Sequence, residues 1–201
     1  MLKNLGKVPN KAFVLITGDN GVGKSILALQ LASELNKKTL IVSTQEDEEE
    51  IKRRVETFNF NLKEYKVEFI SNEIYEGLDS TDLFTIDFEG LLSLVLENYE
   101  VIVLDSIDFL EFMFEDFNLF RKALIVLKNI ARKQNKILIA VSSVYSDPEK
   151  ESFEQFLSDI VIEMYYKDSE RYLFIKKNRF SKHDNKERRF KIEDKKGIVI
   201  L

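Results

Sequence analysis

Short unbroken apolar runs alternate with longer segments of helical spacing over the first two thirds of the chain. Four of the runs are typical of strands buried on both faces of a parallel sheet: residues 12–17, 39–43, 101–104 and 136–141. Four segments with apolar residues three or four positions apart are predicted as helices: residues 24–36, 48–58, 91–99 and 119–134. Strands that alternate with helices predict an α/β fold with a mainly parallel central sheet flanked by helices.

The pattern changes in the last fifth of the chain, where short β-rich segments follow one another closely. These segments are residues 160–165, 172–175, 189–192 and 198–201. Because short polar links separate most of them, we expect antiparallel hairpins that extend one edge of the sheet. The chain has no internal repeat and no low-complexity linker, so residues 1–201 are predicted to form a single domain.

Composition removes several classes of chemistry. With 44% apolar and 32% charged residues, the chain has the balance of an ordinary globular protein. The absence of cysteine excludes disulfides and thiolate metal sites. The single histidine, His183, excludes a histidine-based metal cluster and a Ser-His-Asp triad. No apolar run reaches the ~18 residues of a membrane span, and residues 1–10 lack a signal-peptide core, so we expect a cytoplasmic protein without membrane insertion.

Charge is distributed unevenly. The net charge of −5 gives no general reason to bind nucleic acid. Residues 46–50 are acidic, however, whereas residues 176–196 are strongly basic. These segments are either two solvated faces or two faces that meet between neighbouring subunits.

A glycine-rich segment follows the first predicted strand and opens the first predicted helix. It reads Gly18-Asp19-Asn20-Gly21-Val22-Gly23-Lys24-Ser25 and fits the phosphate-loop pattern G-x-x-x-x-G-K-[ST]. Glycines let backbone N–H groups wrap around phosphate oxygens, and the helix adds its positive N-terminal end. We expect this loop and Ile26 to bind a nucleotide. Lys24 would reach the β- and γ-phosphates, and Ser25 would ligate Mg²⁺.

An acid at the end of a neighbouring buried strand completes such a site. Asp105 follows the apolar run 101–104 and is predicted to hold Mg²⁺ through water beside Ser25. The guanine-reading N-K-x-D pattern is absent from the sequence, so ATP is expected rather than GTP.

Further segments, in order along most of the chain, resemble the KaiC-like ATPases of the RecA superfamily. They are Leu5-Gly6-Lys7-Val8-Pro9, Ile41-Val42-Ser43-Thr44-Gln45-Glu46, Phe58-Asn59-Phe60-Asn61-Leu62, Asp105-Ser106, Leu157-Ser158-Asp159-Ile160-Val161-Ile162, Lys177-Asn178-Arg179 with His183, and Phe190-Lys191-Ile192 with Gly197-Ile198-Val199. The resemblance implies a RecA-like P-loop NTPase fold, Mg²⁺-dependent ATP hydrolysis and assembly into homo-oligomers such as hexamers.

The resemblance also implies roles for particular residues. The family's catalytic glutamate lies just after the second strand, where Glu46 fits and Gln45 replaces the first member of a Glu-Glu pair. Glu46 is therefore expected to activate water, although acids are favoured at a helix N-terminus in any case. If the first position is the essential one, hydrolysis is slow or absent. Ser142 or Ser143 corresponds to the family's γ-phosphate sensor, and a hydroxyl satisfied by the backbone is the alternative.

Lys177 and Arg179 match a Lys-x-Arg pair that, in KaiC-like hexamers, reaches a neighbour's ATP. The resemblance implies that both residues act in trans on charge that develops at the γ-phosphate. The alternative is a basic edge hairpin whose charges stay in water. Phe180 departs from the family, which has glycine at this position.

Three functions remain open at this stage. The first is a KaiC-like ATPase that couples its nucleotide state to self-assembly or to a protein partner. The second is a RadA-type recombinase paralogue acting on DNA. It is disfavoured because the expected contact loops, residues 106–118 and 143–152, are acidic. The third is an ATP-bound, non-hydrolysing scaffold resembling the archaellum component FlaH.

An aromatic cluster follows the strand that ends at Asp105. Its members are Phe109, Leu110, Phe112, Met113, Phe114, Phe117 and Phe120. Some of them are expected in the core, and the remainder would be available to dock a partner or a neighbouring subunit.

Overall fold

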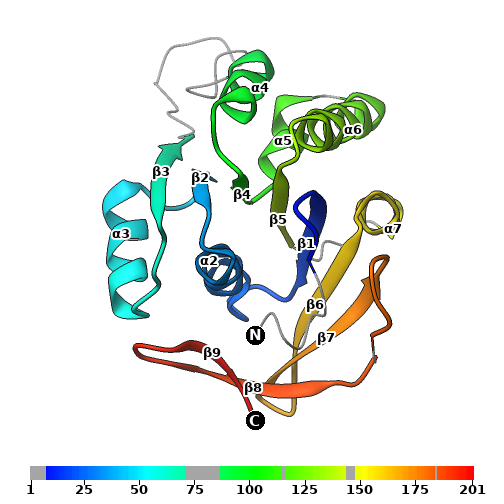
Figure 1. The fold of residues 1–201 in the computed structure, drawn as a ribbon. Helices are drawn as coiled ribbons and strands as arrows, with labels where there is room; N and C mark the ends of the chain where they lie inside the picture. The colour runs from blue at the N-terminus through cyan, green and yellow to red at the C-terminus, as the bar shows by residue number, and fades with distance from the viewer. Residues whose placement is uncertain (1–7, 71–86, 115, 144–147, 184) are drawn as a thin grey trace, which may run out of the picture.

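The computed structural model describes residues 8–70, 87–114, 116–143, 148–183 and 185–201 (Figure 1). In this part of the chain the strands are β1 (Ala12–Gly18), β2 (Lys38–Ser43), β3 (Glu64–Phe69), β4 (Val101–Asp105), β5 (Ile137–Ser143), β6 (Ile160–Lys167), β7 (Glu170–Asn178), β8 (Arg188–Glu193) and β9 (Gly197–Ile200). The helices are α2 (Lys24–Leu35), α3 (Glu48–Thr57), α4 (Phe88–Leu96), α5 (Phe109–Met113), α6 (Phe117–Lys133) and α7 (Pro148–Leu157).

One sheet runs through the described molecule in the order β3-β2-β4-β5-β1-β6-β7-β8-β9. In this spatial order, the strands β3, β2, β4, β5, β1 and β6 all run parallel to one another. From β6 onward each strand pairs antiparallel with the next. The predicted α/β fold with C-terminal antiparallel hairpins is therefore confirmed.

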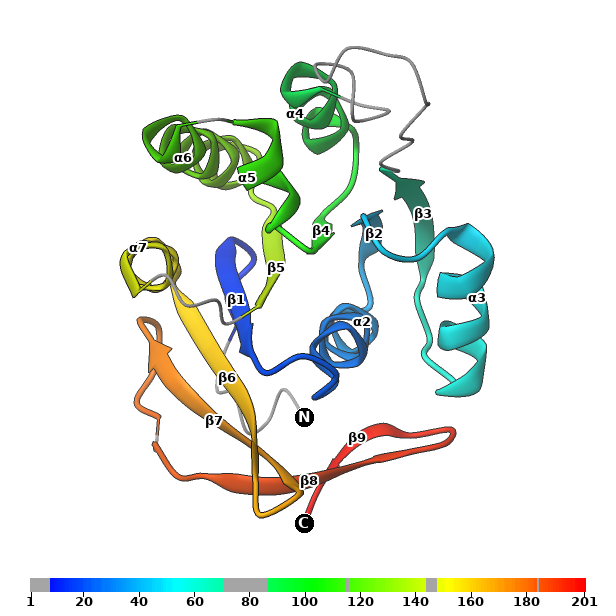
Figure 2. The same cartoon turned by 180° about the vertical axis from the view of Figure 1, so that it is seen from behind.

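Helices cover both faces of the parallel strands (Figures 1 and 2). Alternate residues of each strand enter opposite cores, because successive side chains of a strand point to opposite faces. On β1, Val14 and Ile16 pack with α2 and α3, whereas Phe13 and Leu15 pack with α4, α5 and α6. The central strands β1, β4 and β5 are mainly apolar because both of their faces are covered. None of the described helices is long and apolar enough to span a bilayer.

The sequence prediction missed one strand and two helices. Strand β3 reads EYKVEF and lies at the edge of the sheet beside β2. Its alternating charges mask its β character, because an edge strand tolerates charge. Helix α5 lies in the segment predicted as a loop after residue 105. The first half of helix α7 lies in the segment 143–152, which was also predicted as a loop, and its sequence PEKESFEQFL carries few apolar residues.

The C-terminal hairpin folds back across α2. The Ile198 N–H donates to Gln30 Oε1 at 2.7 Å, and Gln30 Nε2 donates to the Ile198 carbonyl at 3.2 Å. Gly197 has φ +73°, and a Cβ there would lie 2.7 Å from both Gln30 Oε1 and the Phe60 ring. Only glycine allows this close approach. Strands β8 and β9 therefore lie across α2 from the parallel strands (Figure 2).

The aromatic cluster belongs largely to the core. Phe109, Leu110 and Phe120 are buried. Met113, Phe114 and Phe117 are partly buried against the same core, on the face of α4 and α6. The side chain of Phe112 lies outside the described part of the structure. The described members thus serve mainly to pack α5 and α6 onto the sheet.

Candidate functional site

The glycine-rich loop joins β1 to α2 with a backbone that requires glycine. Gly18 has φ +142°, and a Cβ there would lie 1.7 Å from the Met164 carbonyl oxygen. Gly23 has φ +113°, and a Cβ there would lie 2.9 Å from Ile192 Cδ1. Both positions combine a left-handed backbone with close neighbours, so the loop can take this path only with glycine. Its first and last glycines are thereby held against β6 and β8.

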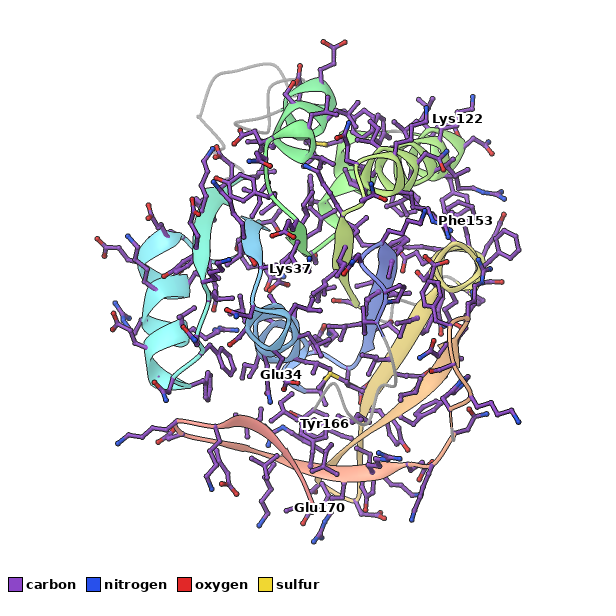
Figure 3. The ribbon with its side chains drawn as sticks, in the orientation of Figure 1. Glu34, Lys37, Lys122, Phe153, Tyr166 and Glu170 are labelled. Carbon is purple, nitrogen blue, oxygen red and sulfur yellow. The ribbon has the colours of Figure 1, made fainter. Side chains whose placement is uncertain are left out.

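The end of β6 braces the loop from one side. Asp19 Oδ2 accepts a 2.8 Å hydrogen bond from the Tyr166 N–H, and the Tyr166 hydroxyl donates to the Gly21 carbonyl at 2.9 Å. The Asp19 N–H also donates to the Met164 carbonyl at 3.0 Å. Figure 3 shows where Tyr166 lies among the C-terminal strands. These contacts give the loop its shape without using the groups that would face a phosphate.

Lys24 is the first residue of α2 and its side chain lies along the loop. Its ammonium donates to the Gly18 carbonyl at 2.8 Å and to the Asp19 carbonyl at 2.9 Å, and the residue is only 8% exposed. Burial lowers the pKa of Lys24, while the negative charges of Asp108, Asp105 and Asp19 oppose this effect. A positive charge is therefore held inside the curve of the loop.

The structure brings the predicted metal ligands together. The side chains of Ser25, near the start of α2, and Asp105, at the end of β4, line the same cavity. Burial raises the pKa of Asp105, and the Ser25 hydrogen bond and the charges of Arg54 and Lys24 act in the opposite direction. Asp105 ends β4 between Ser43 of β2 and Val141 of β5. The site thus lies at the carboxyl ends of the parallel strands, where ligands bind in open α/β sheets.

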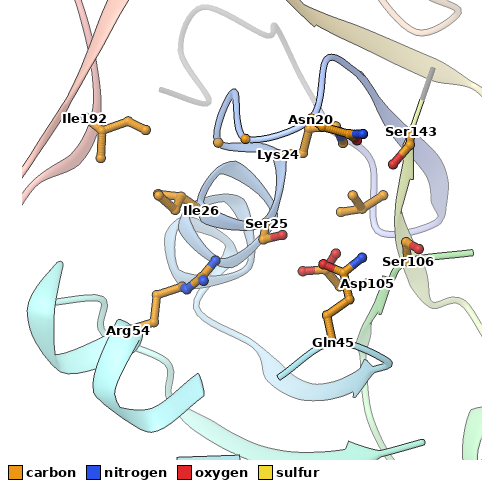
Figure 4. Close-up of a pocket in the computed structure, with 13 residues that line it drawn as sticks. Asn20, Lys24, Ser25, Ile26, Gln45, Arg54, Asp105, Ser106, Ser143 and Ile192 are labelled. Carbon is orange, nitrogen blue, oxygen red and sulfur yellow. The ribbon is translucent and has the colours of Figure 1, made fainter. Parts of the chain in front are cut away.

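A cavity of ≈ 470 Å³ opens beside these groups (Figure 4). It is lined by Asn20, Gly21, Gly23, Lys24, Ser25, Ile26, Gln45, Arg54, Asp105, Ser106, Val141, Ser143 and Ile192. Three of the predicted loop residues, Gly18, Asp19 and Val22, do not line the cavity. Val22 is fully buried in the core, and the Asp19 side chain accepts the hydrogen bond from Tyr166 of β6. Sequence reasoning missed Arg54 and Ile192 because both come from distant parts of the chain.

Gln45 and Glu46, which follow β2 after Thr44, face different ways. Gln45 lines the cavity, whereas the Glu46 carboxylate pairs with the Arg54 guanidinium and lines a second hollow that shares Arg54 with the first. Burial raises the pKa of Glu46, although the charge of Arg54 acts against this. The expected role of Glu46 in activating water stays a prediction, and it is Gln45 that borders the phosphate loop.

Lys177 and Arg179 lie outside the cavity of their own chain. Lys177 is paired with Val161 on β6, which lies beside Leu15 on β1, three residues before the loop begins. Its ammonium donates to the Gln155, Phe156 and Ser158 carbonyls at the end of α7, at 2.6, 3.2 and 2.7 Å. Burial and the charge of Arg179 lower the pKa of Lys177 to about 8.

Arg179 binds the same end of α7. Its guanidinium donates to the Phe156 carbonyl at 3.0 Å and lies 3.5 Å from Asp159 Oδ1. Neither Lys177 nor Arg179 lines the cavity described above. Their expected action on the nucleotide of another copy stays a prediction.

A buried charged network lies behind Ser143. The Ser143 N–H donates to Asp108 Oδ2 at 3.1 Å, and Lys150 Nζ lies 3.1 Å from Asp108 Oδ1. The Ser142 hydroxyl donates to Glu154 Oε2 at 2.7 Å. Ser143 lines the cavity and Ser142 does not, so Ser143 is the better placed of the two sensor candidates. Asp108, expected in an acidic loop, is only 4% exposed.

A glycine-built loop at a helix N-terminus, with a buried lysine and a Ser–Asp pair, defines a P-loop nucleotide-binding protein of the RecA-like class. The family model for the KaiC ATPase matches residues 2–201, so the chain belongs to the KaiC ATPase family. Among solved structures, the fold is similar to the KaiC-like protein PH0186 from the hyperthermophilic archaeon Pyrococcus horikoshii OT3. That match has a TM-score of 0.75 and 20% identity, and it covers 98% of this chain and 91% of that chain. No curated protein matches the chain.

Proposed function

We propose that this protein binds Mg²⁺-ATP in the cavity beside residues 18–25 and hydrolyses it slowly, coupling nucleotide state to self-assembly or to a protein partner. The observation that supports this most directly is that Lys24, Ser25 and Asp105 line the same cavity. Membership of the KaiC ATPase family supports the same conclusion.

The groups at the cavity fit both ATP and Mg²⁺. The loop carries glycines at 18, 21 and 23 and a lysine at its inner side, which suits phosphate oxygens. The Ser25 hydroxyl and the Asp105 carboxylate are oxygen donors of the kind that Mg²⁺ prefers, and they would hold it beside the phosphates. Bound Mg²⁺ would offset phosphate charge. Ile26 and Ile192 provide an apolar surface beside Gly23 for the remainder of a nucleotide.

We expect Lys24→Met to weaken Mg²⁺-ATP binding by about 100-fold. The substitution keeps a stem of similar length but removes an ammonium that would make charge-assisted hydrogen bonds, each contributing about 1.5–3 kcal/mol. Equilibrium titration with a fluorescent ATP analogue would measure the change. Lys52→Met on the exposed side of α3 is the control, because Lys52 pairs with Glu48 outside the cavity. Equal affinities of Lys24→Met and the unmodified protein would contradict the proposed site.

Arg179→Ala tests whether the basic pair acts on a neighbour. We expect nearly unchanged ATP affinity, because Arg179 lies outside the cavity of its own chain, and a fall in turnover of about 100-fold. Steady-state ATP hydrolysis, measured beside molecular mass, is the readout.

Arg132→Ala is a matched control for that experiment. Arg132 and Arg179 are both 43% exposed at the side chain, and they lie 3.6 and 3.5 Å from the same Asp159 oxygen. If both variants lose turnover equally, the effect comes from the charge balance at Asp159. A loss confined to Arg179→Ala supports action in trans within a homo-oligomer such as a hexamer.

A second candidate function is an ATP-bound scaffold that does not hydrolyse its nucleotide. The observation that favours it is Gln45, since an amide lies where the cavity would need a carboxylate to accept a proton. Tight ATP binding without turnover, at every degree of assembly, would support the scaffold over the slow ATPase.

A further inference from the structure

Arg54 is a cation at the wall of the phosphate cavity that comes from a different element than the loop. It lies in the last turn of α3, and its side chain lines the cavity together with Ser25, Ile26 and Asp105. Figure 4 shows the side chain extending from α3 toward the first turn of α2. Lys24 approaches the same cavity from the loop, so the two cations enter it from different sides.

Glu46, which does not line the cavity, forms an ion pair with the Arg54 side chain. A guanidinium nitrogen of Arg54 donates a hydrogen bond to Glu46 Oε1. Both side chains are largely buried, with exposures of 26% for Arg54 and 23% for Glu46. The other carboxylate oxygen of Glu46 is buried, with no hydrogen-bond partner in the described part of the chain. The contact with Arg54 is therefore the one that this carboxylate uses.

The backbone fixes Glu46 in turn. Its N–H donates to Ser43 Oγ at 3.0 Å, at the end of β2. The next residue, Asp47, caps α3 by accepting from the Glu50 N–H at 2.9 Å. Glu46 and Arg54 thus lie at opposite ends of one short helix whose start is anchored to the sheet.

The chemistry of arginine suits a ligand on the cavity side. A guanidinium has five N–H donors in a rigid fork and stays charged in proteins. Glu46 is its hydrogen-bond partner among the described residues, which leaves donors for a second group. The fork matches phosphate oxygens, and such charge-assisted contacts are stronger than neutral ones.

We propose that Arg54 is a further nucleotide-binding residue, contributed by α3 of the same chain, and that Glu46 is its positioning residue. The guanidinium binds the phosphate chain of a nucleoside polyphosphate on the Ser25–Ile26 side of the cavity, while Glu46 keeps it directed there. This inference rests on the proposed function, because it concerns the same ligand in the same cavity.

The first experiment compares the Mg²⁺-ATP affinity of Arg54→Gln, Arg54→Lys and Arg53→Gln. We expect Arg54→Gln to weaken binding by about 10-fold to 100-fold, as removal of a charged hydrogen bond does. Arg54→Lys should recover part of the loss, since it restores the charge but not the fork. Arg53 is the matched control: it adjoins Arg54 on α3, is exposed and lies outside the cavity, so Arg53→Gln should bind normally.

The second experiment tests the positioning role with a double-mutant cycle. We expect Glu46→Gln to weaken ATP binding by about 3-fold to 10-fold in the natural background and to have no further effect when Arg54→Gln is present. The double variant replaces the ion pair by two neutral amides, so no unpaired charge is left in the site and correct folding is favoured. Thermal unfolding would verify that the variant is folded. If Glu46 were instead the base, Glu46→Gln would lower turnover and leave affinity unchanged, and the positioning role would be wrong.

Measuring Mg²⁺-ATP binding by the unmodified protein distinguishes a failure of this inference from a failure of the proposed function. If it does not bind Mg²⁺-ATP, the proposed function is wrong. If it binds Mg²⁺-ATP and folded Arg54→Gln binds equally well, the proposed function stands and only the role of Arg54 is overturned.

Discussion

Gln45→Glu is expected to raise the rate of ATP hydrolysis by about 10²-fold to 10⁴-fold, the range that a positioned general base contributes. Gln45 lines the cavity beside Ser25 and Asp105, whereas Glu46 is turned toward Arg54. An amide can orient a water molecule but cannot take its proton, so we expect the natural residue to limit the reaction. Phosphate release under saturating Mg²⁺-ATP would measure the change.

Two controls accompany Gln45→Glu. Adding Lys24→Met should abolish the gained activity, because the new carboxylate acts on a nucleotide that the loop must first bind. Gln45→Ala should hydrolyse ATP no faster than the natural protein. An unchanged rate in folded Gln45→Glu would mean that residue 45 does not contact the attacking water.

Lys150→Met is expected to cost about 3–5 kcal/mol of stability, as loss of one partner from a buried ion pair does. Lys150 is only 3% exposed and lies 3.1 Å from Asp108 Oδ1 and 3.8 Å from Glu154 Oε1. The substitution removes the cation that offsets two buried carboxylates. For a chain of this size the melting temperature should fall on the order of 10 °C.

Thermal unfolding of three variants would check this expectation. Lys122→Met, on the exposed surface of α6, should change stability by less than about 0.5 kcal/mol (Figure 3). Adding Asp108→Asn to Lys150→Met should recover part of the loss, because it removes one of the uncompensated charges. A melting temperature of Lys150→Met equal to that of Lys122→Met would show that the network contributes little.

The phosphate loop could be predicted from the sequence because its chemistry is local. Eight consecutive residues carry the backbone donors, the cation and the metal-binding hydroxyl, and a buried strand and a helix flank them. Asp105 could be predicted equally well, because an acid after an apolar run is expected at the carboxyl edge of the sheet. The structure places Asp105 and Ser25 around the same cavity.

The rest of the site depends on tertiary structure. Whether Gln45 or Glu46 faces the cavity is decided by the turn after β2, where Ser43 Oγ accepts from the Glu46 N–H. Arg54 was indistinguishable from its neighbour Arg53, because both lie on a highly charged helix and only one reaches the cavity. Lys150 and Asp108 resembled solvated charges, since burial of a charged pair leaves no mark in composition.

The first loop and the last hairpin of the chain form parts of the same cavity. Ile192 of β8 contributes to its wall, and Gln30 of α2 holds β9 through two hydrogen bonds to Ile198. Local opening of this hairpin would remove that wall, so a ligand bound there stabilises the closed form by mass action. Occupancy of the cavity and fraying of the C-terminal strands are therefore linked equilibria.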